Sequence, residues 1–367
     1  MVIKRFIDCK VPLQTCTLRC HYCYVTHNKQ FDSKVPIFKY DAKYVGLALN
    51  QERLGGVCMF NLCADGETLL SNQIVGYIKA ILEQGHYVMV VTNGTVSKRF
   101  DEIIELPKHL LAHLFFKFSF HYLELTKKNL LHIFFDNIKK VRASGCSFTL
   151  EVTPSDELIP HIDDIKRISL EEVGALCHVT VARNDRVSEM PILTKLTRKD
   201  YKKIWSAFNS ELFDFKLSVF GEKRTEFCYA GDWSACLDLG TGEMRQCYCS
   251  ASVQNIFENV DVPIIFRAIG KCREAHCHNA HAFLCFGDIP EMVTPFYSQV
   301  RNRICSDGKE WLSPEMKKAM SHKLVEANNV YTKNEKIKAL LYRNVYLSFK
   351  ALKKVIFIIT RRYKNAV

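Results

Sequence analysis

Three cysteines stand close together near the start of the chain, at Cys16, Cys20 and Cys23 in the segment CTLRCHYCYV. A loop this short can bring three thiolates to one point, which suits a metal ion or a metal cluster. Zinc would need a fourth ligand, for which His21 and Cys9 are the available neighbours. A [4Fe–4S] cube held by three cysteines instead leaves one iron open to a small molecule. The spacing favours the iron–sulfur cluster, with zinc as the alternative.

A second group of seven cysteines lies between Phe227 and Gly287, in about a sixth of the chain. Its members are Cys228, Cys236, Cys247, Cys249, Cys272, Cys277 and Cys285. So many thiols in a segment with little regular periodicity are typical of a module organised around metal, either an auxiliary iron–sulfur cluster or a structural zinc ion. Three histidines in the same segment, His276, His278 and His281, could donate hydrogen bonds to the metal ligands, but are expected to be polar surface residues.

The elements that must position these residues alternate between strands and helices through the first two hundred residues. Strands are expected at 57–63, 87–94, 115–122, 147–154 and 175–182, and helices at 71–85 and 126–145. Strand–helix–strand units about thirty residues apart are typical of a parallel sheet. Near-continuous apolar strands indicate a sheet that is covered on both faces. Chemistry in such sheets and barrels gathers at the carboxyl ends of the strands, where the segments ADGET and TNG and the pair Ser119 and His121 stand.

The segment CTLRCHYCYV resembles the CxxxCxxC signature of the radical S-adenosylmethionine (radical SAM) superfamily, including an aromatic residue before the last cysteine. The resemblance implies that the three cysteines bind a [4Fe–4S] cluster whose fourth iron chelates S-adenosylmethionine (SAM). Further matches follow in order: ADGETLL resembles the family's GGEP segment, which receives the methionine ammonium of SAM, and TNG matches a segment after the third strand. The cofactor-binding residues that the resemblance implies are Tyr22, Gly66, Glu67, Asn93 and Ser119.

The GGEP-like segment departs from the family pattern at two positions, where Asp65 and Thr68 replace glycine and proline. Gly66 lets backbone approach the ligand, and the Glu67 carboxylate complements an ammonium. Asp65 adds a negative charge near the cofactor, so we expect the ammonium contact to be arranged differently and SAM binding to be retained. The resemblance covers about residues 1–210 and implies an α/β fold, the partial (β/α)6 barrel of the family.

The stretch from Cys228 to Cys247 resembles the opening half of the SPASM pattern, a C-terminal extension that carries auxiliary [4Fe–4S] clusters. It includes an expected hairpin over 237–247 with Gly240 and Gly242 at its turn. The later cysteines are spaced more widely than the pattern requires, so one auxiliary cluster is expected, as in the shortened twitch version. Its expected ligands are Cys228, Cys236, Cys247 and one of Cys272, Cys277 and Cys285.

The resemblance implies reductive cleavage of SAM to a 5′-deoxyadenosyl radical that abstracts a hydrogen atom from a substrate. SPASM-type relatives mostly modify peptides or proteins, so the expected substrate is a peptide or protein side chain and the expected electron donor a flavodoxin or ferredoxin. No catalytic acid or base is assigned, and Tyr122, Glu151 and Arg183 are expected to be structural or solvated. The alternative is a non-catalytic zinc- or cluster-binding adaptor whose tail binds a membrane or a polyanion.

Three parts are expected along the chain. They are a radical SAM core over 1–212, closed by a polar helix around 194–210, a small cysteine-rich auxiliary-cluster domain over 213–300 and a basic helical tail over 301–367. The net charge of +12 is concentrated at the end, because residues 330–367 contain ten Lys or Arg and one acid. The remainder of the chain is therefore nearly balanced.

A cationic amphipathic tail can lie on an anionic membrane surface, bind an acidic partner, or pack its apolar stripe on the protein. No nucleic acid is expected, because neither a zinc-finger histidine pair nor an RNP-like aromatic motif accompanies the charge. The start of the chain lacks the apolar run of a signal peptide. The expected location is the cytoplasm, with membrane association through the tail as an option.

Overall fold

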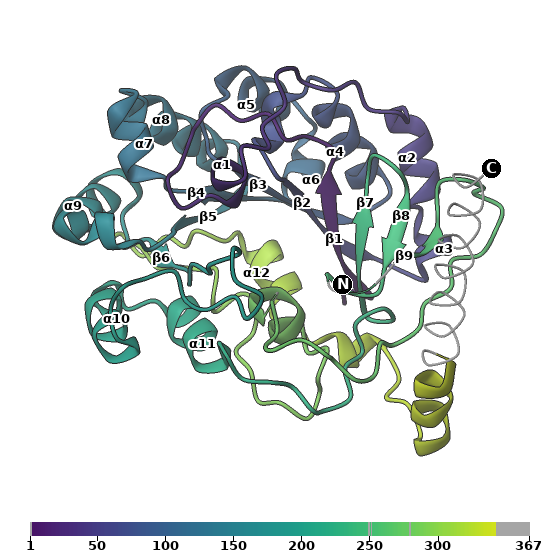
Figure 1. The fold of residues 1–367 in the computed structure, drawn as a ribbon. Helices are drawn as coiled ribbons and strands as arrows, with labels where there is room; N and C mark the ends of the chain where they lie inside the picture. The colour runs from purple at the N-terminus through teal and green to yellow at the C-terminus, as the bar shows by residue number, and fades with distance from the viewer. Residues whose placement is uncertain (1, 249, 251, 279, 343–367) are drawn as a thin grey trace, which may run out of the picture.

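The computed structural model describes residues 2–248, 250, 252–278 and 280–342 (Figure 1). The basic end of the tail and Cys249 lie outside these described residues. A sheet of nine strands organises this part of the chain, in the order β6-β5-β4-β3-β2-β1-β7-β8-β9. The first six strands are parallel and follow chain order: β1 (Arg5–Val11), β2 (Cys58–Ala64), β3 (Tyr87–Thr92), β4 (Leu114–Ser119), β5 (Ser147–Val152) and β6 (His178–Val179).

Helices connect these strands and lie mainly on one side of the sheet, where Figure 1 shows α4, α5 and α8. Their bounds are α2 (Ala42–Ala48), α4 (Ile74–Glu83), α5 (Ser97–Ile104), α7 (Tyr122–Lys127), α8 (Leu131–Ala143) and α9 (Ile162–Val173). Short helices of one turn are α1 (Tyr24–His27), α3 (Gln51–Leu54) and α6 (Lys108–Leu111). The predicted α/β fold with a parallel sheet is confirmed, and the five predicted strands are β2 to β6.

Alternate residues of the strands pack on opposite sides of the sheet, as the pleat requires. Ile7 and Phe60 face the helices and join the larger apolar cluster. Phe6 and Met59 face the other way and join a second cluster with residues from the C-terminal part of the chain. Phe6 stacks on Phe286 with ring centroids 4.9 Å apart. The C-terminal part therefore covers the face of the sheet that the helices leave open.

The predicted hairpin is present and continues the same sheet. β7 (Ser234–Asp238) pairs in parallel with β1, and β8 (Glu243–Arg245) and β9 (Ser252–Asn255) follow in antiparallel order. Gly242 adopts a φ of +78° at the turn, where the N–H donates to the carbonyl of Asp238 at 2.8 Å. This part of the expected auxiliary domain thus shares its sheet with the core.

The open face of the sheet is covered by α11 (Glu211–Val219), the π-helix η4 (Ala280–Leu284) and α12 (Pro314–Met320), which contribute Leu212, Phe283 and Met316 to the second cluster. The helix α10 (Arg198–Trp205) contributes to the larger cluster instead. Residues 301–320 lie within the fold: Arg301 is fully buried beside Glu151, and Trp311 packs on Phe148 with ring centroids 5.2 Å apart. No helix within the described ranges combines the length and the apolarity that a membrane span needs.

Candidate functional site

The three clustered cysteines lie in the loop between β1 and α1 and line a cavity of about 380 Å³ at the carboxyl ends of the parallel strands. Burial, with a smaller contribution from Glu67, raises the pKa of Cys16 to about 11. Burial also raises the pKa of Cys20, and the nearby Cys16 and Cys23 raise it further. The three thiols are therefore close enough to interact electrostatically.

Three thiols on one cavity wall form a donor set that fits an iron–sulfur cluster, since thiolates are its usual ligands. Among the described residues, no three His, Cys, Asp or Glu side chains already surround a single metal position. The cysteines thus share a cavity, and their convergence on one cluster stays a prediction. Binding of a metal cluster is the step expected to bring thiols of this kind together, because ligation and local folding are coupled.

Gly66 lies directly against the cysteine loop. Its N–H donates to the carbonyl of Leu13 at 3.0 Å, and the next N–H, of Glu67, donates to the carbonyl of Thr15 at 2.9 Å. A Cβ atom at Gly66 would lie only 2.0 Å from the oxygen of Thr15. Glycine is therefore required here for close approach of two backbones, and the loop after β2 is fastened to the loop that carries the cysteines.

The Glu67 side chain is 1% exposed and binds the end of the neighbouring strand β3. Its carboxylate accepts hydrogen bonds from Thr92 Oγ1 at 2.6 Å, from Asn93 N at 2.7 Å and from Leu69 N at 3.0 Å. Burial raises the pKa of Glu67, and these hydrogen bonds oppose the rise. The protein itself fills most of the acceptor positions of this carboxylate, which gives Glu67 a positioning role. The predicted contact with the SAM ammonium stays a prediction.

Asn93 links the end of β3 to the cysteine loop. Its Nδ2 donates to Thr17 Oγ1 at 2.8 Å and lies 3.6 Å from Cys16 Sγ, while its Oδ1 accepts a hydrogen bond from the Thr95 hydroxyl at 2.8 Å. A donor beside a thiolate stabilises its charged form. Together with Glu67, Asn93 therefore fixes the position of the loop and assists the first of its three cysteines.

The other two residues implied by the resemblance also line the cavity. Ser119 stands at the end of β4, and Tyr22 Oη lies 2.5 Å from Nδ1 of His121. Burial, and next the charge of Lys117, lowers the pKa of His121 to about 4, so the imidazole is neutral at physiological pH. Tyr22 is thereby held between the cysteine loop and the end of β4.

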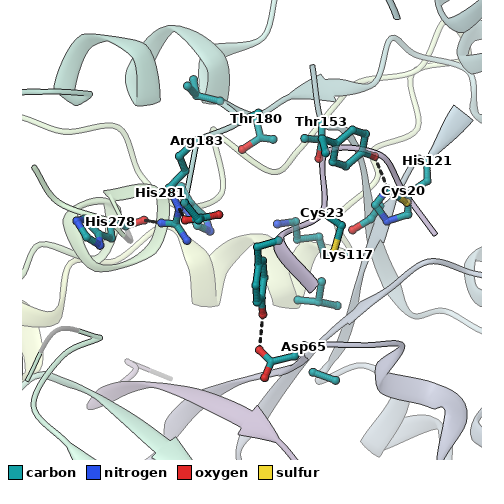
Figure 2. A pocket seen from close by; sticks show the side chains of 18 of the residues that line it. Cys20, Cys23, Asp65, Lys117, His121, Thr153, Thr180, Arg183, His278 and His281 are labelled. Atoms are coloured by element: carbon teal, nitrogen blue, oxygen red, sulfur yellow. Dashed lines mark hydrogen bonds and ion pairs between the residues drawn. The ribbon is translucent and has the colours of Figure 1, made fainter. Parts of the chain in front are cut away.

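Asp65, the departure from the family pattern, faces cationic and hydroxyl groups of the protein. Its carboxylate lies 3.0 Å from Nζ of Lys10 and accepts a hydrogen bond from the hydroxyl of Tyr24. Figure 2 shows Asp65 at the edge of the pocket, away from Cys20 and Cys23. Lys10 balances the added negative charge within the protein.

The histidines of the cysteine-rich segment were expected at the surface, and this expectation is wrong. His276, His278 and His281 all line the cavity that contains the cysteine loop. His276 is 2% exposed and packs on Phe220 with ring centroids 4.4 Å apart. The segment folds back over the carboxyl ends of the strands, a long-range contact that the local sequence does not indicate.

A second cavity, of about 210 Å³, lies in the cysteine-rich segment. The four cysteines that line it are Cys228, Cys247, Cys272 and Cys277. Burial, the carboxylate of Asp288 and the neighbouring thiols raise the pKa of Cys228. Cys236 lines a different cavity beside Asp8, and Cys285 lies in the apolar cluster around Phe286. Of the expected auxiliary ligands, the structure therefore brings four to one cavity and leaves two outside it.

The fold and the site define a class: an α/β protein whose parallel strands, taken in chain order, end around a cavity lined by a CxxxCxxC loop. The family model described as "Radical SAM superfamily" matches residues 11–159. The chain accordingly contains a radical SAM domain. No curated protein matches the chain.

Three solved structures are among those that match this chain. The structure of Streptococcus suis SuiB bound to S-adenosylmethionine is 15% identical with a TM-score of 0.50, over 71% of this chain and 65% of SuiB. SuiB bound to the precursor peptide SuiA has 15% identity and a TM-score of 0.48, over 71% and 64% of the two chains. Native anSMEcpe with bound AdoMet and the Cp18Cys peptide has 14% identity and a TM-score of 0.45, over 70% and 78%. The match thus spans just under two thirds of SuiB.

Proposed function

We propose that this protein is a radical SAM enzyme, with Cys16, Cys20 and Cys23 as the ligands of a [4Fe–4S] cluster. One observation carries the proposal: the three cysteines line a single cavity whose wall is completed by Gly66 and Glu67 of the GGEP-like loop. The cysteine loop and the GGEP-like loop are about 45 residues apart in the sequence, and the fold brings them to the same cavity. A cluster with one open iron needs such a cavity, because the small molecule that binds the iron must be held beside the cysteines.

When bound, the cluster and SAM supply the electron transfer and the 5′-deoxyadenosyl radical that define the family's chemistry. The residues of this chain hold the site in place. Gly66 and Glu67 fasten the loop after β2 to the cysteine loop and to β3, and Asn93 fastens β3 to Thr17. The neutral His121 fixes Tyr22. Such positioning selects one bond of the substrate and excludes competing reactions of the radical.

We further propose that Cys228, Cys247, Cys272 and Cys277 hold one auxiliary [4Fe–4S] cluster. The four thiols line one cavity, and four thiolates complete the ligand set of such a cluster. The same set suits a structural zinc ion, so iron and zinc analysis of the purified protein separates the two. Cys277 and His276 are neighbours in sequence, and His276 lines both cavities. The auxiliary site therefore adjoins the first cavity.

The substrate that we propose is a peptide or a protein side chain. Support comes from the resemblance of the segment Cys228–Cys247 to the SPASM pattern, whose carriers mostly modify peptides or proteins. A flavodoxin or ferredoxin is the proposed electron donor, and the basic tail is the proposed contact with a membrane surface.

The test is anaerobic purification, followed by measurement of iron, sulfide and zinc and of 5′-deoxyadenosine released from SAM under dithionite. The expected protein is brown and forms 5′-deoxyadenosine. The variant C16A/C20A/C23A is expected to lose this activity, and C146A, which removes an isolated buried cysteine, is expected to keep it. A colourless protein with stoichiometric zinc and no SAM cleavage would instead support the adaptor.

A further inference from the structure

The cavity that contains the cysteine loop has a second wall, made of cationic and imidazole side chains. They come from β4, from the segment after β6, from α11 and from η4: Lys117, Arg183, Lys216 and His281. Figure 2 shows Arg183 and His281 on the side of the pocket opposite Cys20, with Lys117 between the two sides. We call these four residues the cationic wall. Their elements are far apart in the sequence, so the wall is a product of the fold.

Carboxylates balance only part of the positive charge around this wall. Glu151 is buried and forms ion pairs with two cations, its oxygens lying 3.0 Å from Nζ of Lys117 and 2.5 Å from Nη1 of Arg301. Asp185 pairs with Arg183 at 3.2 Å. The excess of cations in a buried position is costly, because charges that leave water need a partner.

Of the lysine and arginine residues of the wall, Lys216 forms no ion pair with any described residue, whereas Lys117 and Arg183 each form one. Its Nζ donates to the hydroxyl of Thr180 at 2.5 Å. Burial lowers the pKa of Lys216 to about 7. The charged groups that face it are Glu151, which raises this pKa, and Lys117, Arg183 and Arg301, which lower it further. An anion bound beside Lys216 would stabilise its charged form.

His281 supplies a further donor at the same place. Its Nδ1 atom is buried and has no hydrogen-bond partner within the part of the chain that the structure describes. Burial and the charge of Lys216 lower the pKa of His281, so its imidazole is neutral and one ring nitrogen carries a hydrogen. The wall thus presents three hydrogen-bond donors to one bound ligand: the ammonium of Lys216, the guanidinium of Arg183 and an imidazole N–H of His281.

We propose that the cationic wall binds a carboxylate of the substrate, namely an acidic side chain of a peptide. This inference rests on the proposed function, which places SAM and its own carboxylate at the cysteine side of the cavity. A carboxylate is the anion that peptides carry, and charge-assisted hydrogen bonds from Lys216 and Arg183 match its two oxygens. Anchoring the acidic side chain at the far wall holds a neighbouring C–H bond of the peptide toward the cysteine side.

The experiment compares two synthetic libraries of short N-acetylated, C-amidated peptides, identical in composition except for one central Glu in the first and one Gln in the second. Each library is incubated with full-length holoprotein and SAM, and the retained peptides are quantified by mass spectrometry. The variants are K216M, which keeps the size of the side chain, and R183Q. The control is K203M, which removes an exposed lysine on α10. Circular dichroism checks that each variant is folded.

The wild type and K203M are expected to retain about three times as much of the Glu library as of the Gln library, or more. This ratio corresponds to the modest net free energy that one ion pair between the peptide carboxylate and the wall contributes. K216M and R183Q are expected to bring that ratio close to one. Equal retention of the two libraries by the wild type overturns the proposal. A loss of SAM binding in K216M, measured by equilibrium dialysis, also overturns it, because the wall would then hold the carboxylate of SAM.

Failure of the proposed function has a different signature. If the wild type releases no 5′-deoxyadenosine under dithionite but retains the Glu library selectively, the wall binds acidic peptides in a protein without this chemistry. If it releases 5′-deoxyadenosine and shows no selectivity, the proposed radical SAM function is supported and the proposed binding of a carboxylate by the cationic wall is wrong.

Discussion

Substitution of Gly66 by alanine tests whether the loop after β2 positions the cysteine loop. The added Cβ would lie 2.0 Å from the oxygen of Thr15, 2.6 Å from its carbonyl carbon and 2.8 Å from the carbonyl carbon of Gln14. These are backbone atoms, so no side-chain rotation relieves the contact. Non-bonded atoms are at optimal separation at about 3.5 Å, and the two loops must therefore move apart by about 1 Å or more.

A displacement of this size breaks the hydrogen bonds from Gly66 N to Leu13 and from Glu67 N to Thr15, which are 3.0 and 2.9 Å long. Two lost hydrogen bonds cost about 1–3 kcal/mol together, and overpacking adds a similar amount. Because the strain falls on the loop that carries Cys16, we expect G66A to remain folded and to lose most of its cluster iron and its SAM affinity.

The assay is iron and sulfide content after anaerobic reconstitution, with SAM affinity from equilibrium dialysis. G76A is the matched control, since Gly76 lies in α4 and its added Cβ would come no closer than 3.2 Å to the Cβ of Ala42. That control is expected to be neutral or to gain up to about 1 kcal/mol of stability from helix propensity. If G66A keeps wild-type iron content and SAM affinity, the backbone contact does not position the cysteines and the reasoning is refuted.

Three further predictions follow from the same contacts. In E67Q an amide nitrogen replaces the carboxylate oxygen that accepts the hydrogen bond from Asn93 N. The protein should lose about 2 kcal/mol of stability, its melting temperature should fall by about 2–4 °C, and its SAM affinity should fall. An unchanged melting temperature would contradict the role of Glu67. C277S should remove about four iron atoms per chain, whereas C285S should not, and equal losses would contradict the auxiliary ligand set. Lys216 has a pKa of about 7, so its charge is present below that pH and lost above it. Retention of the Glu library should therefore fall from about pH 6 to about pH 8 toward the retention of the Gln library, and should be flat in K216M.

The strands that sequence patterns could predict are those with continuous apolar runs. β1 was missed because Arg5, Asp8 and Lys10 interrupt its apolar residues. Arg5 and Asp8 are nevertheless buried, since Arg5 pairs with Asp232 and Asp8 accepts a hydrogen bond from Asn61 at 2.7 Å. Partners so far away in the sequence leave no local signal. The same holds for the cationic wall, where Arg183 was expected to be solvated or structural and Lys216 was not singled out.

The motifs of the candidate site could be found because the fold preserves their order. Parallel strands that follow chain order in a sheet place the end of each strand beside the end of the next. The cysteine loop follows β1, Gly66 and Glu67 follow β2, Asn93 follows β3 and Ser119 ends β4. The short motifs at successive strand ends therefore lie side by side and form one continuous wall, and their positions along the chain are enough to predict it. The opposite wall is built by the chain returning across the sheet, and its composition depends on the crossing path that α11 and η4 take over those strand ends. Substitutions at Gly66 should therefore disturb cofactor binding, and substitutions at Lys216 should disturb substrate binding alone.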